Sequence, residues 1–168
     1  MHYKIKSYLQ RRMKIVRREF RSRWKNYLYQ SLLATAVAVA VFWILRAQNL
    51  VVIASIASSA FIVFAMPNSI TAQPRRLIGG HLTGVLAGFL AGLLAQLNAP
   101  SIVIYALAVG LSIFIMVVLD LEHAPASGTA LGIAIGGFYP NVVLTVILSC
   151  VLLAIAHRFL RRFLIDLT

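Results

Sequence analysis

Acidic residues are scarce in this 168-residue sequence, which has four of them against 16 lysines and arginines. Charged residues make up only 12% of the chain and hydrophobic residues 61%, a balance that excludes an ordinary soluble domain. The single cysteine, Cys150, excludes an internal disulfide. The sequence has no nucleophile–base signature and no spacing typical of a metal site. It therefore predicts neither an enzyme nor a bound metal or cofactor.

Long apolar runs dominate what is present, and most are close to the roughly 17–25 residues that a membrane-spanning helix needs. We expect an all-α polytopic membrane protein with about five spans and a short or broken glycine-rich segment. Full spans are predicted at 31–45, 50–66, 77–97, 102–119 and 141–158, and the short segment at 126–138. One helix from Gly128 to Ala156 would be about 43 Å long, more than the roughly 30 Å of a bilayer core, so we predict a break near Tyr139 and Pro140.

The first 30 residues carry ten of the 16 basic side chains, and their apolar residues recur at intervals of three and four. This pattern predicts a basic amphipathic helix over 1–30, followed by a transmembrane domain over 31–168. We expect the helix to lie on the cytoplasmic lipid surface against anionic headgroups. It is too long and too amphipathic for a cleaved signal peptide. Nucleic acid is not expected as a partner, because the bilayer is the nearer anionic surface.

Basic residues also predict the topology, since they concentrate on the cytoplasmic side of a membrane. The N-terminus, the Arg75/Arg76 loop and the 120–127 loop are assigned to the cytoplasmic side of the inner or plasma membrane, and Arg46 to the outside. The basic C-terminal tail prefers the cytoplasmic side too, which requires the last part of the chain to cross and return. The alternative has five spans and an external basic tail.

Glycines recur every fourth residue in the third predicted span, which places them on one helix face. This spacing allows another backbone to come close, as in the packing of membrane helices. A second small-residue run follows in the short segment, and we expect these faces to support packing and self-association into a homo-oligomer. The helix-packing glycines are Gly80, Gly84, Gly88, Gly92, Gly128, Gly132 and Gly136.

Two polar connectors, 66–81 and 120–127, interrupt the apolar pattern. Each follows an apolar span, contains proline with a histidine nearby, and precedes a glycine-rich helix, so that 50–92 and 102–137 form a loose internal repeat. Two intervening spans place both connectors on the same side of the membrane. A paired arrangement interrupted by proline and glycine points to a transport site.

The connectors together resemble the HPP family of integral membrane proteins. The first reads Ala72-Gln73-Pro74-Arg75-Arg76-Leu77-Ile78-Gly79-Gly80-His81, and the second His123-Ala124-Pro125-Ala126-Ser127-Gly128-Thr129-Ala130-Leu131. Ala124 stands in place of the first motif proline and Arg76 in place of an asparagine. The resemblance covers roughly residues 50–157 and leaves the basic helix outside. It implies a small helical membrane protein, with nitrite transport attributed to plastid and cyanobacterial-type members.

Passage of an anion requires positive potential and hydrogen-bond donors. The arginines and histidines of the connectors supply these, and the helix starts after the prolines offer free backbone N–H groups. We predict a substrate pathway lined by Gln73, Arg75, Arg76, His81, Asp120, Glu122, His123, Pro125, Ser127 and Thr129. Two simpler interpretations remain open, with the arginines as topological anchors and the histidines as buried rings bonded to a carbonyl or to Gln73. Histidine also takes up protons near neutral pH, which makes proton-coupled uptake chemically reasonable.

The carboxylates Asp120 and Glu122 oppose this interpretation, because they would repel anions at the entrance. We predict that they pair with Arg75 or Arg76 across the two connectors. The alternative is a metal site that combines both carboxylates with His81 and His123. The sequence thus favours a transporter of small anions, nitrite by resemblance. The alternative is a membrane scaffold or sensor that binds lipid or a partner through its basic helix.

Overall fold

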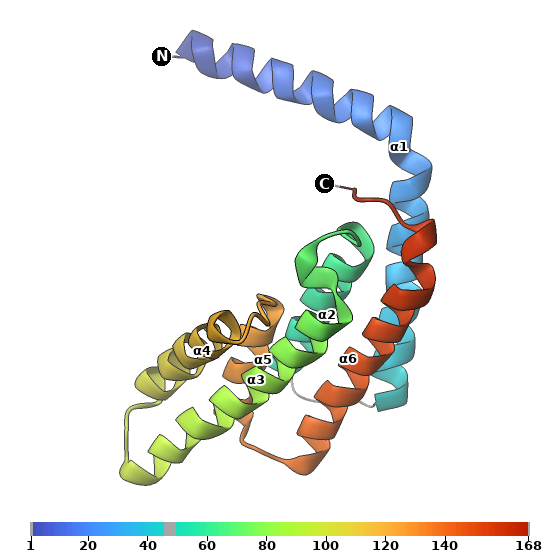
Figure 1. Cartoon of the computed structure of the whole chain (residues 1–168). Coiled ribbons are helices and arrows are strands. Elements are labelled where there is room, and N and C mark those ends of the chain that lie inside the picture. The colour runs from blue at the N-terminus through green and yellow to red at the C-terminus, as the bar shows by residue number, and fades with distance from the viewer. Residues whose placement is uncertain (1, 46–49, 168) are drawn as a thin grey trace.

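The computed structural model describes residues 2–45 and 50–167, and this part of the chain forms six α-helices joined by loops and short 3-10 turns. The helices are α1 (His2–Leu45), α2 (Leu50–Ala65), α3 (Pro74–Gly92), α4 (Ser101–Val118), α5 (Pro125–Gly136) and α6 (Pro140–Leu160). The all-α prediction is confirmed (Figure 1). The loop predicted at Arg46 lies outside the described residues.

Four helices are long and apolar enough to cross a membrane, and they comprise α1, α3 with its 3-10 extension, α4 and α6. Helix α2 has 16 residues and α5 has 12, which makes α5 about 18 Å long and too short to span. The predicted short segment and the break after it are therefore confirmed. Gly137 takes a left-handed φ of 87°, which favours glycine, and Pro140 opens α6 in the first helical turn.

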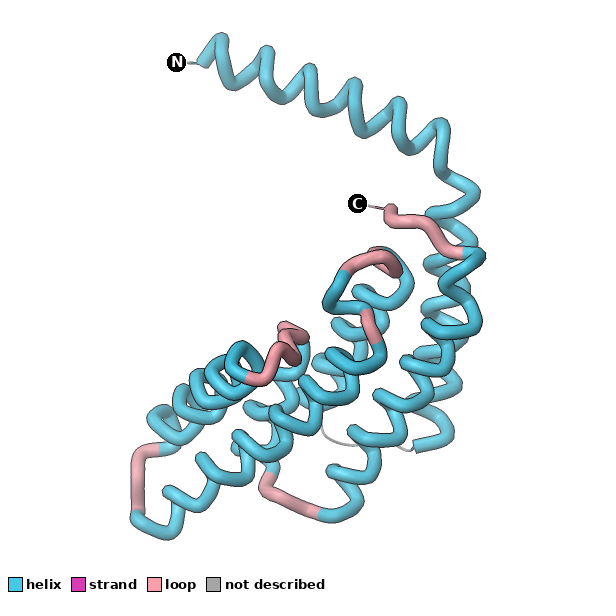
Figure 2. Tube along the Cα trace, in the orientation of Figure 1, coloured by secondary structure: helices cyan, strands magenta, loops and turns pink. Residues whose placement is uncertain are grey.

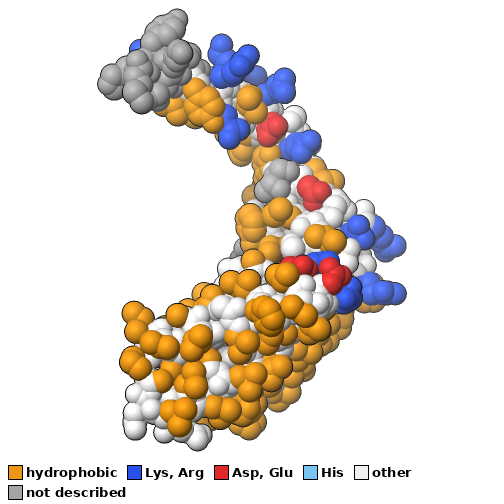
Figure 3. Space-filling view, turned by 60° about the vertical axis from the view of Figure 1, so that its left-hand side comes forward, with side chains coloured by type: hydrophobic (Ala, Val, Ile, Leu, Met, Phe, Trp, Pro, Cys, Tyr) orange, Lys and Arg blue, Asp and Glu red, His pale blue; other side chains and the backbone are white. Residues whose placement is uncertain are grey.

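Helix α1 is continuous over 44 residues, about 66 Å, and so combines the predicted amphipathic helix with the first span. Its sequence contains no glycine or proline, so nothing local ends the helix between the two parts. Figure 1 shows the second part beside α6 and the first part projecting from the bundle. Basic side chains follow the projecting part (Figure 3), together with exposed apolar ones such as Val16 and Phe20.

Helix α5 packs against α2, α3 and α4, and its contact with α3 depends on glycine. A Cβ atom added at Gly80 would lie 2.7 Å from the His123 Cβ, and one at Gly88 would lie 2.5 Å from the Ala130 carbonyl oxygen. A Cβ at Gly84 would collide with the carbonyl of Ala126. These three glycines thus lie at close contacts within one molecule, where a side chain would not fit.

The other predicted packing glycines differ. Gly128 packs against Ser55 of α2, where an added Cβ would lie 3.2 Å from the Ser55 Cβ. Gly132 is buried in α5, and Gly136 is exposed at its end. At Gly92 an added Cβ would meet nothing within 4 Å of the same molecule, because the stripe passes beyond the end of α5 there.

The C-terminal tail returns to the connector between α2 and α3. The His157 ring donates to the carbonyl of Pro67 over 2.9 Å, and the N–H of Asn68 donates to Asp166 over 3.0 Å. On α1, the buried Gln30 donates to the carbonyl of Ile165 over 2.9 Å. The basic tail, the connector and the projecting part of α1 therefore share one end of the bundle, which contradicts the alternative topology with the tail on the opposite side.

Candidate functional site

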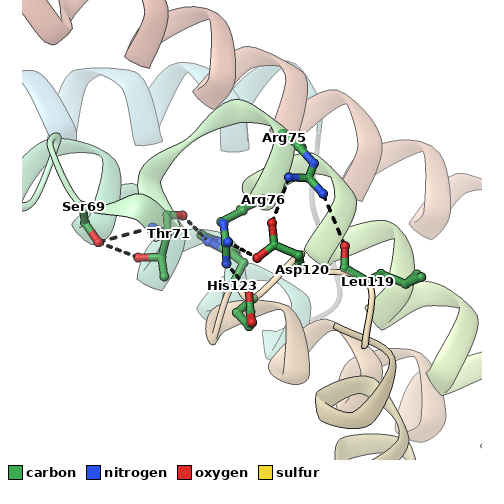
Figure 4. A network of polar contacts seen from close by, with 8 residues as sticks. Ser69, Thr71, Arg75, Arg76, Leu119, Asp120 and His123 are labelled. Carbon is green, nitrogen blue, oxygen red and sulfur yellow. Dashed lines mark hydrogen bonds and ion pairs between the residues drawn. The ribbon is translucent and has the colours of Figure 1, made fainter. Parts of the chain in front are cut away.

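The two polar connectors meet at this end of the bundle. Figure 2 shows the loop before α3 near the loop between α4 and α5, and Figure 4 shows the side chains that join them. Arg76 donates to both Asp120 and Glu122, while Arg75 donates to Asp120 over 3.0 Å and to the Leu119 carbonyl over 3.4 Å. The predicted pairing across the connectors is confirmed. We call Arg75, Arg76, Asp120 and Glu122 the arginine–carboxylate cluster.

The two arginines of this cluster are consecutive residues in the first turn of α3. Their side chains therefore point in different directions and differ in burial. The side chain of Arg75 is 62% exposed and that of Arg76 is 9% exposed. The hydrogen bond from Arg75 is the main cause that lowers the pKa of Asp120, with Arg76 adding to it. Asp120 is therefore ionised at neutral pH, and the cluster combines two arginines with two carboxyl groups, so that its formal charges balance.

Beneath the cluster lies a second polar group, which we call the histidine network. Its members are Ser55 and Ser59 of α2, His81 of α3, His123 of the connector, Thr129 of α5 and the backbone carbonyl of Thr71. The four side chains of Ser59, His81, His123 and Thr129 are at most 1% exposed. Polar groups buried among membrane helices are costly unless they are hydrogen-bonded, so this network is both structural and a candidate site.

Ser59 lies at the centre of the network. Its Oγ is 2.8 Å from Nε2 of His81 and 2.9 Å from Nε2 of His123. The two rings are tilted by 53° with their centroids 5.2 Å apart. At the outer ends, Nδ1 of His81 is 2.7 Å from the Thr129 hydroxyl, and Nδ1 of His123 is 2.9 Å from the Thr71 carbonyl oxygen.

His123 belongs to the connector and not to a spanning helix, although its ring is buried. Burial lowers the pKa of His123, and the hydrogen bond to the Thr71 carbonyl opposes this only in part. The ring is therefore neutral at pH 7 in this conformation. The interpretation of both histidines as buried rings bonded to a carbonyl is confirmed for His123, whereas His81 bonds to hydroxyls.

The remaining predicted pathway residues are not all brought together. Gln73 is exposed at the start of α3, away from the buried rings. Ser127 faces α4, where the hydroxyl of Ser112 donates to it over 3.2 Å. Pro125 contributes its carbonyl, which accepts from the Ser55 hydroxyl over 2.6 Å.

Sequence reasoning missed Ser55 and Ser59, the two residues that connect α2 to the site. They lie four residues apart in a span whose other hydroxyl belongs to Ser58, and this spacing places Ser55 and Ser59 on one face of the helix. That spacing was the available signal. The carbonyl of Thr71 carries no sequence signal, because any residue at that position supplies one.

A groove of about 410 Å³ lies at the other end of α3, lined by residues such as Gly92, Gly136 and Tyr139. Between it and the histidine network, Gly84 and Gly88 hold α3 and α5 in direct backbone contact. A pathway from one end to the other would therefore require these helices to separate.

The metal alternative does not fit the geometry. The two carboxylates bind arginines at the surface and the two imidazoles bind hydroxyls in the interior. Within residues 2–45 and 50–167, no group of three or more histidine, cysteine, aspartate or glutamate side chains could hold a metal ion.

Comparison with known proteins identifies a family of membrane proteins. The family described as "HPP, transmembrane region" matches residues 19–164. This range is wider than the 50–157 expected from the motifs and begins inside the basic part of α1. A transmembrane protein from Dictyostelium discoideum is 42% identical over 102 residues, which are 56% of this chain and 36% of that protein. This chain thus spans about a third of the relative's length, and no solved structure gives a significant match.

Proposed function

Because the chain belongs to the HPP family of transmembrane proteins, we propose that it carries a small anion across the membrane, with nitrite the first candidate. The N-terminus and both connectors then face the cytoplasm of a cell whose inner or plasma membrane holds the protein. Transport needs no chemical step and no metal.

One observation carries the proposal: a buried hydrogen-bonded pair of histidines in a helical membrane bundle. Ionisable side chains buried inside a helical membrane protein are rare and usually mark ion or proton pathways. His81 and His123 are held by three helices and two connectors, so a change in their protonation would act on all of these elements. The N–H groups of the two rings are hydrogen-bonded within the network, so an oxyanion that binds them would displace the Thr71 carbonyl or the Ser59 hydroxyl.

The arginine–carboxylate cluster supports this proposal in a limited way. Pairing removes the repulsion that Asp120 and Glu122 alone would exert on an anion. It also occupies both arginines, so the cluster has no net formal charge. An anion that enters here must therefore displace a carboxylate from Arg76. The cluster would then act as a gate and not as a site of net positive charge that attracts anions.

The test is flux into proteoliposomes that contain the full chain, with nitrite, nitrate and chloride offered separately. We expect nitrite uptake above that of empty liposomes and a loss of uptake in His123→Asn, which keeps a donor near the Thr71 carbonyl but removes the Nε2 position. Ser58→Ala is a matched control because Ser58 is exposed on α2 and donates only within its own helix. Absence of flux for all three anions in folded protein would refute the proposal.

The second candidate is a scaffold or sensor, favoured by the projecting part of α1. This part presents basic residues and exposed apolar residues, including Met13, Phe20 and Trp24, at 46–61% exposure. Such a helix suits an anionic lipid surface. Self-association would have to use another face than Gly80, Gly84 and Gly88, since α5 covers them. Lipid-dependent behaviour of α1 without anion flux would favour this candidate.

A further inference from the structure

We propose that Ser59 passes a proton between His81 and His123, so that the two rings share a single exchangeable proton and serve as the proton site of the protein. The role of this site in uptake rests on the proposed function. The proton exchange itself is argued from the hydrogen bonds alone and does not depend on that function.

The Thr71 carbonyl sets the direction of the hydrogen bonds. A carbonyl oxygen only accepts, so Nδ1 of His123 carries a hydrogen and donates it over 2.9 Å. In the neutral ring Nε2 then has a lone pair and accepts from the Ser59 hydroxyl over 2.9 Å. Ser59 has one hydrogen and has now used it, so its oxygen must accept from Nε2 of His81 over 2.8 Å.

The same reasoning continues on the other side of His81. A neutral ring with its hydrogen on Nε2 has a lone pair on Nδ1, which accepts from the Thr129 hydroxyl over 2.7 Å. The Ser55 hydroxyl lies 2.8 Å from the Thr129 oxygen and 2.6 Å from the Pro125 carbonyl oxygen, and its single hydrogen goes to one of these two acceptors. Four hydrogens thus fill four hydrogen bonds that all point the same way, from the Thr129 hydroxyl to the Thr71 carbonyl.

Two further contacts provide room for an added proton. The Ser59 oxygen is also 3.1 Å from the Ser55 carbonyl, and the Ser55 oxygen is 2.6 Å from the Pro125 carbonyl. If Nε2 of His123 gains a proton, it donates to Ser59, whose hydroxyl rotates toward the Ser55 carbonyl. If Nδ1 of His81 gains it instead, the hydroxyls of Thr129 and Ser55 rotate in the same sense. The network thus accepts one proton on either ring through rotation of hydroxyl groups alone.

Exchange between the two rings needs no other group. Starting from a doubly protonated His81, Nε2 gives its proton to the Ser59 oxygen as the Ser59 hydroxyl proton moves to Nε2 of His123. One N–H and one O–H bond break and one of each forms, and the positive charge moves from the first ring to the second. Because the network ends at the Thr71 carbonyl, which does not pass a proton on, the pair stores a proton rather than conducting it across the membrane.

The pair holds one proton and not two, because two imidazolium rings 5.2 Å apart in a buried site would repel each other. Nearby charges do not offset this repulsion. Helices α2 and α5 and the 3-10 turn Ile70–Ala72 contain no ionisable residue. The charged groups that α3 and the α4–α5 connector contribute are those of the arginine–carboxylate cluster, where they pair with one another at the surface.

The first experiment measures this proton directly, by nitrogen NMR of the full chain in nanodiscs with ¹⁵N-labelled histidine. His81→Asn and His123→Asn assign the two signals. We expect His123 with its hydrogen on Nδ1 and His81 with its hydrogen on Nε2 near neutral pH. We also expect a common titration of both signals by one proton as the pH falls below the ordinary histidine pKa of about 6.5. The reverse assignment of hydrogens, two independently titrating protons, or no proton uptake would each overturn the inference.

Variants at α2 test the role of Ser59. In Ser59→Ala we expect the two ring signals to titrate separately, whereas Ser58→Ala should retain the common titration. Circular dichroism checks that both variants fold. If Ser59→Ala does not fold, the NMR titration of the unmodified protein still tests the inference. Unchanged common titration in folded Ser59→Ala would refute the relay.

The link to transport is tested in proteoliposomes with a pH-sensitive dye inside. If nitrite enters with a proton, Ser59→Ala should reduce the nitrite-driven pH change at least about tenfold while Ser58→Ala does not. If no anion enters with any variant, the proposed function fails and the NMR result still decides whether the relay exists. Nitrite entry with equal pH change in both variants would refute the relay alone.

Discussion

The close contact of α3 with α5 predicts that a single methyl group will separate good from poor packing. In Gly88→Ala the new Cβ would lie 2.5 Å from the Ala130 carbonyl oxygen and 2.8 Å from the Ile133 Cβ. The carbonyl oxygen of Ala130 belongs to the backbone and cannot rotate away as a flexible side chain can, so the whole of α5 must shift. Gly110→Ala is the matched control, since Gly110 lies inside α4 and an added Cβ meets nothing within 4 Å.

The expected magnitude follows from two opposing terms. Replacing a helical glycine by alanine stabilises by roughly 0.5–1 kcal/mol, and this term is common to both variants. Overpacking by one methyl group costs about 1–3 kcal/mol and applies only to Gly88→Ala. The free energies of unfolding of the two variants should therefore differ by about 1–3 kcal/mol, with Gly110→Ala at or above the unmodified protein.

Thermal unfolding in nanodiscs, followed by circular dichroism at one scan rate, measures this difference. A gap of several degrees is expected, since about 1 kcal/mol shifts the midpoint by roughly 2–4 °C in a chain of this size. Because Ala130 is one residue from Thr129, the same variant should also disturb the His81 signal in NMR. A Gly88→Ala midpoint equal to or above that of Gly110→Ala would refute the reasoning.

Three other predictions follow from the shared end of the bundle. Gln30→Ala removes the two bonds between Gln30 and Ile165 of the tail and one to Phe64 of α2, so we expect a loss of about 1–3 kcal/mol and faster proteolysis of the C-terminus. Because the folded pKa of Asp120 is lowered, its stabilising effect is present above the unfolded pKa of about 4 and is lost as pH falls through the folded value. Arg75→Gln should thus weaken the acid dependence of the unfolding midpoint below about pH 4, and an identical dependence would contradict this cause. With Trp43→Phe as background, Trp24 emission should shift to shorter wavelength in nanodiscs with anionic lipid and revert in high salt, and equal emission in neutral nanodiscs would contradict lipid binding.

Most of the fold was predictable because length and hydropathy determine it. Apolar runs, the prolines at 74, 125 and 140 and the glycine at 137 mark where helices begin and end, and the structure follows them. The continuity of α1 was missed, since a change in composition near residue 30 suggested two units although nothing in the backbone ends the helix. A stripe of glycines does not indicate where the partner helix ends, and Gly92 lies beyond the end of α5.

The site was predictable at its charged surface and less so in its interior. Opposite charges on two connectors at the same end of a bundle can be expected to pair, and Arg76 does pair with Asp120 and Glu122. The buried network depends on the rotation of α2, which the sequence does not define in an apolar span. Ser59 therefore emerged only from the structure, although its spacing from Ser55 was visible.

The balanced charge of the arginine–carboxylate cluster leads to a last prediction, which separates a gate from an anchor. Asp120→Asn combined with Glu122→Gln preserves side-chain shape but leaves two arginines without ionised partners. If anions pass here, their uptake at low ionic strength should rise about tenfold or more through electrostatic attraction, and the gain should shrink in salt. Asp166→Asn is the control, because that carboxylate lies at the same end but binds the Asn68 N–H outside the cluster. If the double variant shows lower stability and unchanged uptake, then the cluster only joins the two connectors, and the anion enters elsewhere.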